Sequence, residues 1–288
     1  MPDFIDADVA YLSKDSHITR RFVAPGQEMN TGTLESRRVR IGNARPTQAQ
    51  FKLDLNGFEL FDHASQVRDF DNKDEVSRLY PDEITAAVKT LTGADVVLSR
   101  GWMNRTSGDI KAQQQKNYDH RGGLQPQAAD VHVDYTPAFA ERIAAKAYRD
   151  AMPDGMAYRR FTVFSVWRPF SEPPQDWPLA VCDSRSVAAG EGVANTLHIR
   201  DSMPTHDEMF GPIADENQLP AAAIFHFNPA HRWWYFPHMT RDEILMFKFH
   251  DSDQTRAWRT PHVAFHDSSQ PLANPRKSIE LRVIAYYL

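Results

Sequence analysis

His132 and Asp134 are side chains whose types and spacing could do metal chemistry. They are separated only by Val133, and in a β-strand residues i and i+2 point to the same face. One cation could therefore receive an imidazole nitrogen and a carboxylate oxygen. The tripeptide by itself is weak evidence, because the alternative is a strand-end histidine beside a solvated aspartate. A third ligand is needed to decide between the two.

A histidine late in the chain could supply that ligand. His262 follows a proline and begins an apolar alternation, whereas the nearby His266 precedes Asp267-Ser268-Ser269, which is typical of a solvated turn. We therefore choose His262. Two imidazoles and one carboxylate occupy one face of an octahedral ion and leave positions open, as in non-haem iron(II) oxygenases. His132, Asp134 and His262 are thus the predicted metal ligands and catalytic centre.

Farther downstream, Arg276, Ser278, Glu280 and Arg282 would share one face of a strand. Such a face could simply be exposed to solvent. The functional alternative is that Arg276 forks onto the distal carboxylate of 2-oxoglutarate, because a planar guanidinium suits two-point recognition of a carboxylate. Ser278 would then add a hydrogen bond. Arg282 is the reserve candidate for the same role.

The elements that must position these residues are mostly strands. From Arg159 onward, β-branched and aromatic segments alternate with Pro, Gly and Asp turns, which favours an all-β sandwich or barrel. The expected strands are 160–169, 179–183, 197–200, 222–228, 233–237, 243–250, 261–265 and 278–287. A short strand and turn is also expected within 54–65.

Helices are expected in the first half of the chain. One spans Pro137 to Asp150, and another ends at Gly93 in two pieces, the second opened by Pro81. The first fifty residues are polar and poorly periodic, with an edge strand at 38–41, and a short strand follows at 95–99. We predict a mainly β fold with flanking helices, a double-stranded β-helix (jelly roll, cupin-like). Residues 1–288 would form a single domain, in which 1–128 support a core of 129–288.

Composition limits the classes of partner. The 288 residues are 25% charged and 41% hydrophobic, which is ordinary for a globular protein. A net charge of −5 without runs of Lys or Arg argues against nucleic acid and anionic membranes. The single cysteine, Cys182, excludes an internal disulfide and fits a reducing cytoplasm. We expect a cytoplasmic protein that acts on a small-molecule substrate, with no nucleic-acid or membrane partner, and that could form a homodimer.

Other residues could take part in binding. Trp167 and Arg168 fall on opposite faces of one strand. Trp167 is expected in the core, with substrate contact as the alternative. Arg168 would pair with a buried carboxylate such as Asp183, or with the carboxylate of a substrate or cosubstrate. Arg185 could line the mouth of the pocket, and His198 is the other histidine best suited to touch substrate.

The order His-x-Asp, late His and Arg-x-Ser resembles that of iron(II)/2-oxoglutarate-dependent oxygenases. The likeness is to a branch that includes the cephamycin 7-methoxylation protein (CmcJ-like), fungal hydroxylase/desaturase proteins of the AsaB type and a fungal aziridine-forming enzyme. It is carried by VWRP (166–169), DWPLAVCDSRSV (176–187), NPAHRWWYFPHMTRDEILMFKFHDS (228–252), TPHVAFHD and PRKSIELR, with GFELFDHAS similar to the family's opening. Ser165 departs from the pattern, where asparagine is expected.

The resemblance implies Fe(II), 2-oxoglutarate and O₂ as cofactors, His132, Asp134 and His262 as iron ligands, and Arg276 as the cosubstrate anchor. The implied activity hydroxylates, desaturates or oxidatively cyclises a small molecule, such as an amino acid, a peptide-like compound or another natural-product intermediate, and releases succinate and CO₂. Two alternatives remain at this point. One is an iron oxidase that works without 2-oxoglutarate, and the other is a non-catalytic ligand-binding β-barrel.

Overall fold

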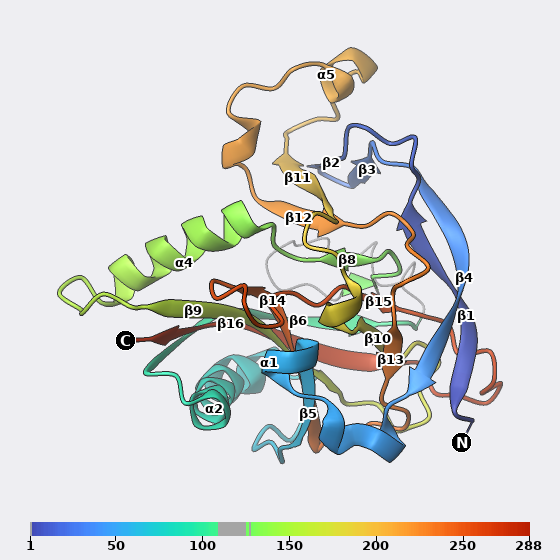
Figure 1. Cartoon of the computed structure of the whole chain (residues 1–288), viewed down its shortest axis with the longest axis vertical. Coiled ribbons are helices and arrows are strands. Elements are labelled where there is room, and N and C mark those ends of the chain that lie inside the picture. Colours follow the sequence, from blue (N-terminus) through green and yellow to red (C-terminus); the bar gives the residue numbers. More distant parts are fainter. Residues whose placement is uncertain (1, 109–124, 127) are drawn as a thin grey trace.

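Two β-sheets dominate the computed structural model, which describes residues 2–108, 125–126 and 128–288 (Figure 1). The ten-stranded sheet has the order β1 (Phe4–Leu12), β4 (Leu34–Asn43), β13 (Trp233–Tyr235), β10 (Leu179–Cys182), β15 (His262–Ala264), β8 (His132–Val133), β12 (Ala221–Ile224), β11 (Val193–Ile199), β2 (Arg20–Ala24), β3 (Gln27–Asn30). The six-stranded sheet has the order β5 (Phe58–Asp62), β14 (Glu243–Asp251), β9 (Arg160–Pro169), β16 (Lys277–Tyr287), β6 (Val96–Thr106), β7 (Gln125–Pro126). The predicted jelly roll is confirmed.

The described helices and 3-10 turns lie in the segments that connect the strands. They are α1 (Leu53–Asn56), α2 (Lys73–Thr92), α4 (Pro137–Ala151) and α5 (His206–Phe210), with 3-10 turns η1 (Arg45–Gln50), η2 (Ser184–Ser186) and η3 (Glu216–Gln218). Figure 1 shows α5 on an excursion between β11 and β12 that projects from the body of the protein. Within the described residues, none of the helices has the length and apolar character needed to span a bilayer.

Helix α2 covers the outer face of the six-stranded sheet. Its buried residues Val76, Tyr80, Ile84 and Val88 recur every fourth position and pack against a cluster that includes Phe164. The prediction of two helical pieces was wrong, because Pro81 lies inside one continuous helix. Proline removes one backbone hydrogen bond, and the buried stripe on both sides of it keeps the two halves on the same surface. Gly93 ends the helix at φ 68° as predicted.

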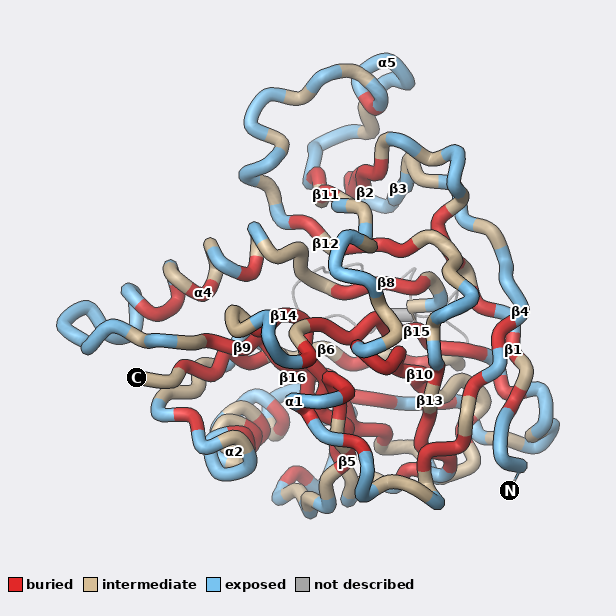
Figure 2. Tube along the Cα trace, viewed as in Figure 1, coloured by how far each residue is buried: buried red, intermediate tan, exposed pale blue. Residues whose placement is uncertain are grey.

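The strands predicted from Arg159 onward are confirmed, with their ends shifted by a few residues. β9 has the predicted bounds, and almost all of it is buried on both faces (Figure 2). The strand predicted at 95–99 continues to Thr106 as β6. Segment 54–65 contains the end of α1, a turn at Gly57 and β5.

The strand content of the N-terminal region was underestimated from the sequence. Residues 4–43 contain four strands, and β4 lies between β1 and β13, so the edge position predicted for 38–41 was wrong. β1 buries alternate residues, namely Ile5, Ala7, Val9 and Tyr11. This period of two is present in the sequence, but acidic residues at the intervening positions made the segment resemble a polar loop.

Candidate metal centre and cosubstrate pocket

Strand pairing brings the three predicted ligands together. His132 and His262 are directly opposed on the antiparallel strands β8 and β15, so their side chains share a face. Asp134 follows β8 immediately. The two strands lie in the middle of the ten-stranded sheet, with β10 beside β15 and β12 beside β8. The site is therefore built on paired strands and is fixed by the sheet register.

The ligand atoms converge within bonding reach of one cation. Nε2 of His132 lies 3.1 Å from Oδ1 of Asp134, and Nε2 of His262 lies 4.0 Å from the same oxygen. One potential ligand atom from each residue lies within 4.8 Å of the others. No second group of three or more such residues occurs in the parts of the chain that the structure describes.

Backbone carbonyls orient both imidazoles. Nδ1 of His132 lies 2.8 Å from the carbonyl oxygen of Asp130, and Nδ1 of His262 lies 3.2 Å from that of Thr260. Carbonyl oxygens only accept, so each Nδ1 must donate, and Nε2 is the ring nitrogen of each histidine that could bind a metal once it carries no proton. An outer-sphere partner of this kind fixes the tautomer of metal-binding histidines. The donor set and its orientation therefore fit iron(II).

Burial and charged neighbours shift the pKa values of all three predicted ligands. Burial alone would lower the pKa of His132, but the hydrogen bond and charge of Asp134 and the charge of Asp130 raise it to about 9. Burial would raise the pKa of Asp134, yet the Arg282 charge and His132 hold it well below its usual range. Burial and the charge of His132 lower the pKa of His262 to about 3. The site thus favours an ionised carboxylate and a compensating positive charge beside it.

Arg282 forms an ion pair with the second carboxylate oxygen of Asp134. Its Nη2 lies 2.5 Å from Oδ2 of Asp134, and its Nε donates to Oε1 of Glu280 at 3.1 Å. The hydroxyl of Ser165 donates to the same Glu280 oxygen at 3.2 Å. Ser165, the position where the family pattern predicts asparagine, therefore belongs to a chain of contacts that ends at Asp134, a predicted metal ligand.

Arg276 and Ser278 present donors that the protein does not use. Both are buried, and Nη1 of Arg276 donates to the carbonyl of Trp177 at 2.8 Å. Nε of Arg276 and Oγ of Ser278 are buried without a hydrogen-bond partner. Burial, together with the charge of Arg105, lowers the pKa of Arg276 to about 9. Unpaired buried donors are costly, so this arrangement fits an anionic ligand with acceptor oxygens, such as a carboxylate.

The predicted strand face is confirmed. Ile279, Leu281, Val283 and Ala285 of β16 pack toward α2, and the opposite face carries Glu280 and Arg282 toward Asp134. The alternative of a solvent-exposed strand was wrong, because nearly all of β16 is buried. Trp167 shares the inner side, with its ring centroid 5.8 Å from the guanidinium carbon of Arg276.

The contacts of Arg168 differ from those expected for its predicted role in cofactor binding. Its guanidinium is buried on the α2 side of β9, where it donates to the hydroxyl of Tyr80 at 3.2 Å and to the carbonyl of His63 at 2.8 Å. A third acceptor is the carbonyl of Arg241. The pairing with Asp183 was also wrong, since that carboxylate binds Arg185. Strand alternation put Arg168 on the face opposite Trp167, which is the reason it faces α2.

The two remaining predicted substrate residues make contacts of their own. Arg185 is a largely exposed side chain, and its Nη2 lies 2.6 Å from Oδ2 of Asp183. His198 is buried on β11, where its Nε2 lies 2.8 Å from Oγ1 of Thr196 and 3.4 Å from Oε1 of Glu216. Neither residue contacts the three ligands. His266, the rejected ligand, packs on Trp177 instead.

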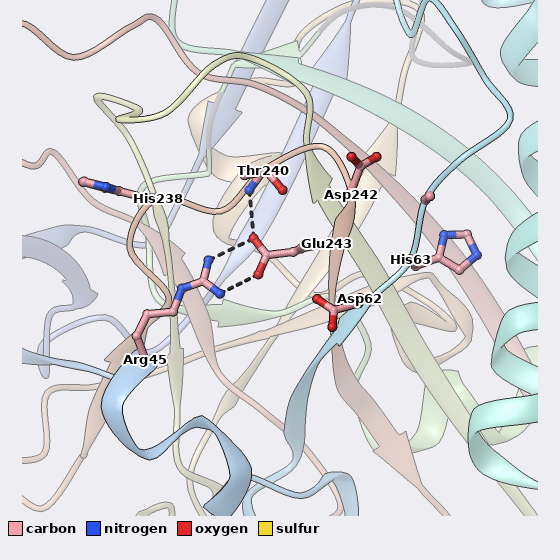
Figure 3. Close-up of a pocket in the computed structure, with 8 residues that line it drawn as sticks. Arg45, Asp62, His63, His238, Thr240, Asp242 and Glu243 are labelled. Carbon is pink, nitrogen blue, oxygen red and sulfur yellow. Dashed lines mark hydrogen bonds and ion pairs between the residues drawn. The ribbon is translucent and has the colours of Figure 1, made fainter.

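A separate pocket of about 670 Å³ opens at the edge formed by β5 and β14 (Figure 3). Its lining includes Asp62, His63 and His238, and Arg45 binds Glu243 across it, with Nη2 donating to Oε2 at 2.9 Å. The amide of Thr240 donates to the same carboxylate oxygen. These contacts link the start of η1 to the start of β14. None of the predicted ligands lines this pocket.

Several residues beside the centre could not be singled out from the sequence. Glu280 was noted only as one polar residue on a strand, and Tyr135, whose ring lies 5.9 Å from the guanidinium carbon of Arg282, was not singled out. Phe247 and Phe249 pack on His262 with centroids 4.7 and 5.6 Å away. Tyr135 follows Asp134 directly, which was an available signal, whereas the two phenylalanines depended on how β14 lies against β15.

Comparisons with known proteins agree with this geometry. A family model described as "Oxidoreductase/YMDC permease-like domain" matches residues 9–286. The Fe(II)/2-oxoglutarate-dependent dioxygenase nvfI of Aspergillus novofumigatus is 30% identical over 91% of this chain and 87% of its own length. The chain belongs to the iron(II)/2-oxoglutarate-dependent oxygenases. The hydroxylase/desaturase CTB9 of Cercospora beticola is 32% identical over 88% of this oxygenase and 77% of its own length.

A solved structure shows that the similarity extends to the whole oxygenase fold. The iron and alpha-ketoglutarate-dependent endoperoxidase NvfI superposes with a TM-score of 0.78 at 25% identity, covering 99% of this chain and 98% of that one. The oxygenase therefore uses Fe(II), 2-oxoglutarate and O₂. An iron oxidase without 2-oxoglutarate and a non-catalytic barrel, the two alternatives left open by the sequence, are not supported by these relatives.

Proposed function

We propose that this oxygenase binds iron through His132, Asp134 and His262, and that Arg276 and Ser278 bind the distal carboxylate of 2-oxoglutarate. The observation that carries the proposal is the convergence of two carbonyl-oriented imidazoles and one carboxylate within 4.8 Å. When bound, the iron with 2-oxoglutarate and O₂ supplies an oxidant for an unactivated C–H bond, with succinate and CO₂ as co-products.

The protein's contribution is to position the ligands and exclude water. Because Arg282 engages one oxygen of Asp134, the other oxygen faces the two imidazoles. Phe247, Phe249 and Tyr135 form aromatic walls beside His262 and Arg282. Such walls keep water away from the reacting centre, which strengthens electrostatic interactions inside it. Arg282 is committed to Asp134, so Arg276 is the better supported cosubstrate anchor.

The substrate is proposed to be a small natural-product intermediate, because the similar hydroxylase/desaturase and endoperoxidase proteins are named for oxidations of this kind. Hydroxylation, desaturation and oxidative cyclisation begin with the same loss of hydrogen from carbon, and the position of the substrate decides between them.

Trp167, beside the proposed anchor Arg276, stays a predicted substrate contact. A single domain of 1–288 and a cytoplasmic location are part of the proposal, and light scattering would test for a homodimer.

The test uses metal binding and cosubstrate binding separately. His132→Ala should lose stoichiometric Fe(II) or Mn(II) under anaerobic conditions while circular dichroism and the unfolding temperature stay close to those of the wild type, since a core of this size does not need the metal. Arg276→Ala should keep the metal and weaken 2-oxoglutarate binding. Retention of one metal per chain by His132→Ala would contradict the assignment, and so would unchanged 2-oxoglutarate affinity in Arg276→Ala.

A further inference from the structure

A hollow of about 450 Å³ lies beside α4, and we call it the α4 groove. One wall is α4 itself, and the other is the segment between η3 and β12, which contributes Gln218 and Pro220. Arg142 of α4 ties the walls together, because its guanidinium donates to three consecutive backbone carbonyls, those of residues 217–219, each at 3.0 Å. Sites for small molecules commonly have this volume. The shape of the groove is therefore fixed by hydrogen bonds between its two walls.

The helical period of α4 leaves large apolar side chains on the side of the groove. The residues of α4 that are buried in the core are Ala140, Ala144, Ala147 and Tyr148. Phe139 and Ile143 lie one turn apart and line the groove, and both are only partly buried. Pro220 adds apolar surface from the other wall. The floor of the groove is therefore apolar surface that the protein itself covers incompletely.

Three cations line the α4 groove. Arg142, Lys146 and Arg149 follow one another at spacings of four and three residues, which places them on one side of the helix. Of the eight described residues that line the groove, none is acidic, although the chain as a whole carries a net charge of −5. Asp150 pairs with Lys146, but both side chains are largely exposed, and such pairs contribute little. The groove thus joins an apolar floor to a positive rim.

We propose that the α4 groove binds a small carboxylic acid with an apolar ring, as a site separate from the metal centre. The carboxylate pairs with Arg149 and Lys146, and a guanidinium suits this role because it presents two parallel donors to a carboxylate. The ring packs on Phe139 and Ile143, where burial of apolar surface stabilises the complex. Arg142 is committed to backbone carbonyls and contributes its charge alone.

The experiment compares three probes that share a naphthalene ring and differ in charge. They are 2-naphthoate, the neutral 2-naphthamide and the cation 2-naphthylmethylammonium, and their binding to the full chain is measured by equilibrium dialysis. Mn(II) and excess 2-oxoglutarate are present and oxygen is excluded, so that the cosubstrate pocket is already occupied. The naphthoate should bind once per chain and about 5-fold more tightly than the amide, as expected for an ion pair that stays in contact with water. The cation should bind most weakly.

Substitution of Arg149 tests whether the charge of the rim selects the acid. Arg149→Met should weaken naphthoate binding about 5-fold and leave naphthamide binding unchanged. Arg149→Glu should reverse the preference, so that the cation binds more tightly than the acid. Lys89→Met is the matched control, because Lys89 and Arg149 are both exposed cations in the last turn of a helix, where they oppose the helix dipole. This control should leave the binding of all three probes unchanged.

Three results would overturn the proposal. One is that the wild type binds the acid no more tightly than the amide, or binds no naphthoate at all. Another is an equal loss of naphthoate binding in Arg149→Met and Lys89→Met, because the position of the cation would then not matter. The last is competition between naphthoate and 2-oxoglutarate, which would place the acid in the cosubstrate pocket. A wild type that binds no 2-oxoglutarate would contradict the proposed function and leave the comparison of the three probes intact.

Discussion

Arg282 forms an ion pair with the carboxylate oxygen of Asp134 that faces away from the two histidines, at 2.5 Å. Nε of the same guanidinium lies 3.1 Å from Oε1 of Glu280. A predicted metal ligand is thereby oriented by an arginine from the last strand of the chain. This contact joins the two sheets at the site where the chemistry takes place.

Replacing Arg282 with Met should weaken metal binding about 10- to 100-fold, as is typical for loss of an outer-sphere partner. The variant leaves Asp134 and Glu280 as buried carboxylates without their shared cation, so the pKa of Asp134 should rise. Calorimetric titration with Mn(II) measures the effect. Arg282→Lys should recover part of the affinity, and Arg38→Met, which alters an exposed arginine, is the control. A larger loss for 2-oxoglutarate than for metal would instead restore Arg282 as the anchor.

Gly57→Ala should destabilise the protein by about 3 kcal/mol, because the residue has φ 88° and an added Cβ would collide with the hydroxyl of Thr260. Gly93→Ala is the matched control: Gly93 also has positive φ, but nothing lies within 4 Å of the added carbon. It should cost only the backbone strain, about 1 kcal/mol. Urea unfolding measures both. The Thr260 carbonyl orients His262, so Gly57→Ala should also weaken metal binding, and equal effects of the two substitutions would refute the steric account.

His250 should make the protein less stable as the pH falls below 6.5. Burial is the main cause that lowers its pKa to about 4, and the charge of Arg259 adds to it. Between pH 6.5 and 4 the unfolded chain takes up a proton that the folded protein does not, so stability falls with falling pH and the loss is complete below pH 4. The total is about 3 kcal/mol. His250→Phe should flatten this part of the pH profile of unfolding, whereas His206→Phe, at an exposed histidine, should not.

Cys182 should be inert in the folded protein. Its side chain is fully buried, and burial raises the pKa of the thiol to about 12, so the reactive thiolate is scarce at neutral pH. A chromogenic disulfide reagent should label no thiol in the native protein at pH 8 and one per chain in denaturant. The labelling rate should then follow unfolding. Rapid labelling under native conditions would show that β10 opens locally.

The sequence by itself determined the residue types of the candidate ligands and their alternation along strands. His132 and Asp134 share a face because a strand has a period of two, and that holds wherever the strand lies. The same period correctly separated Trp167 from Arg168 and placed Arg282 with Arg276. For this reason the late strands, the fold class and the candidate ligands could all be predicted from local patterns.

Only the tertiary structure decided what each face meets. Periodicity says that Arg168 and Trp167 point in opposite directions, but the packing of α2 decides which direction is toward the metal. Arg282 could have been an anchor until the register of β16 placed it against Asp134. Register and layer order depend on contacts between residues far apart in the chain, and no local spacing encodes them.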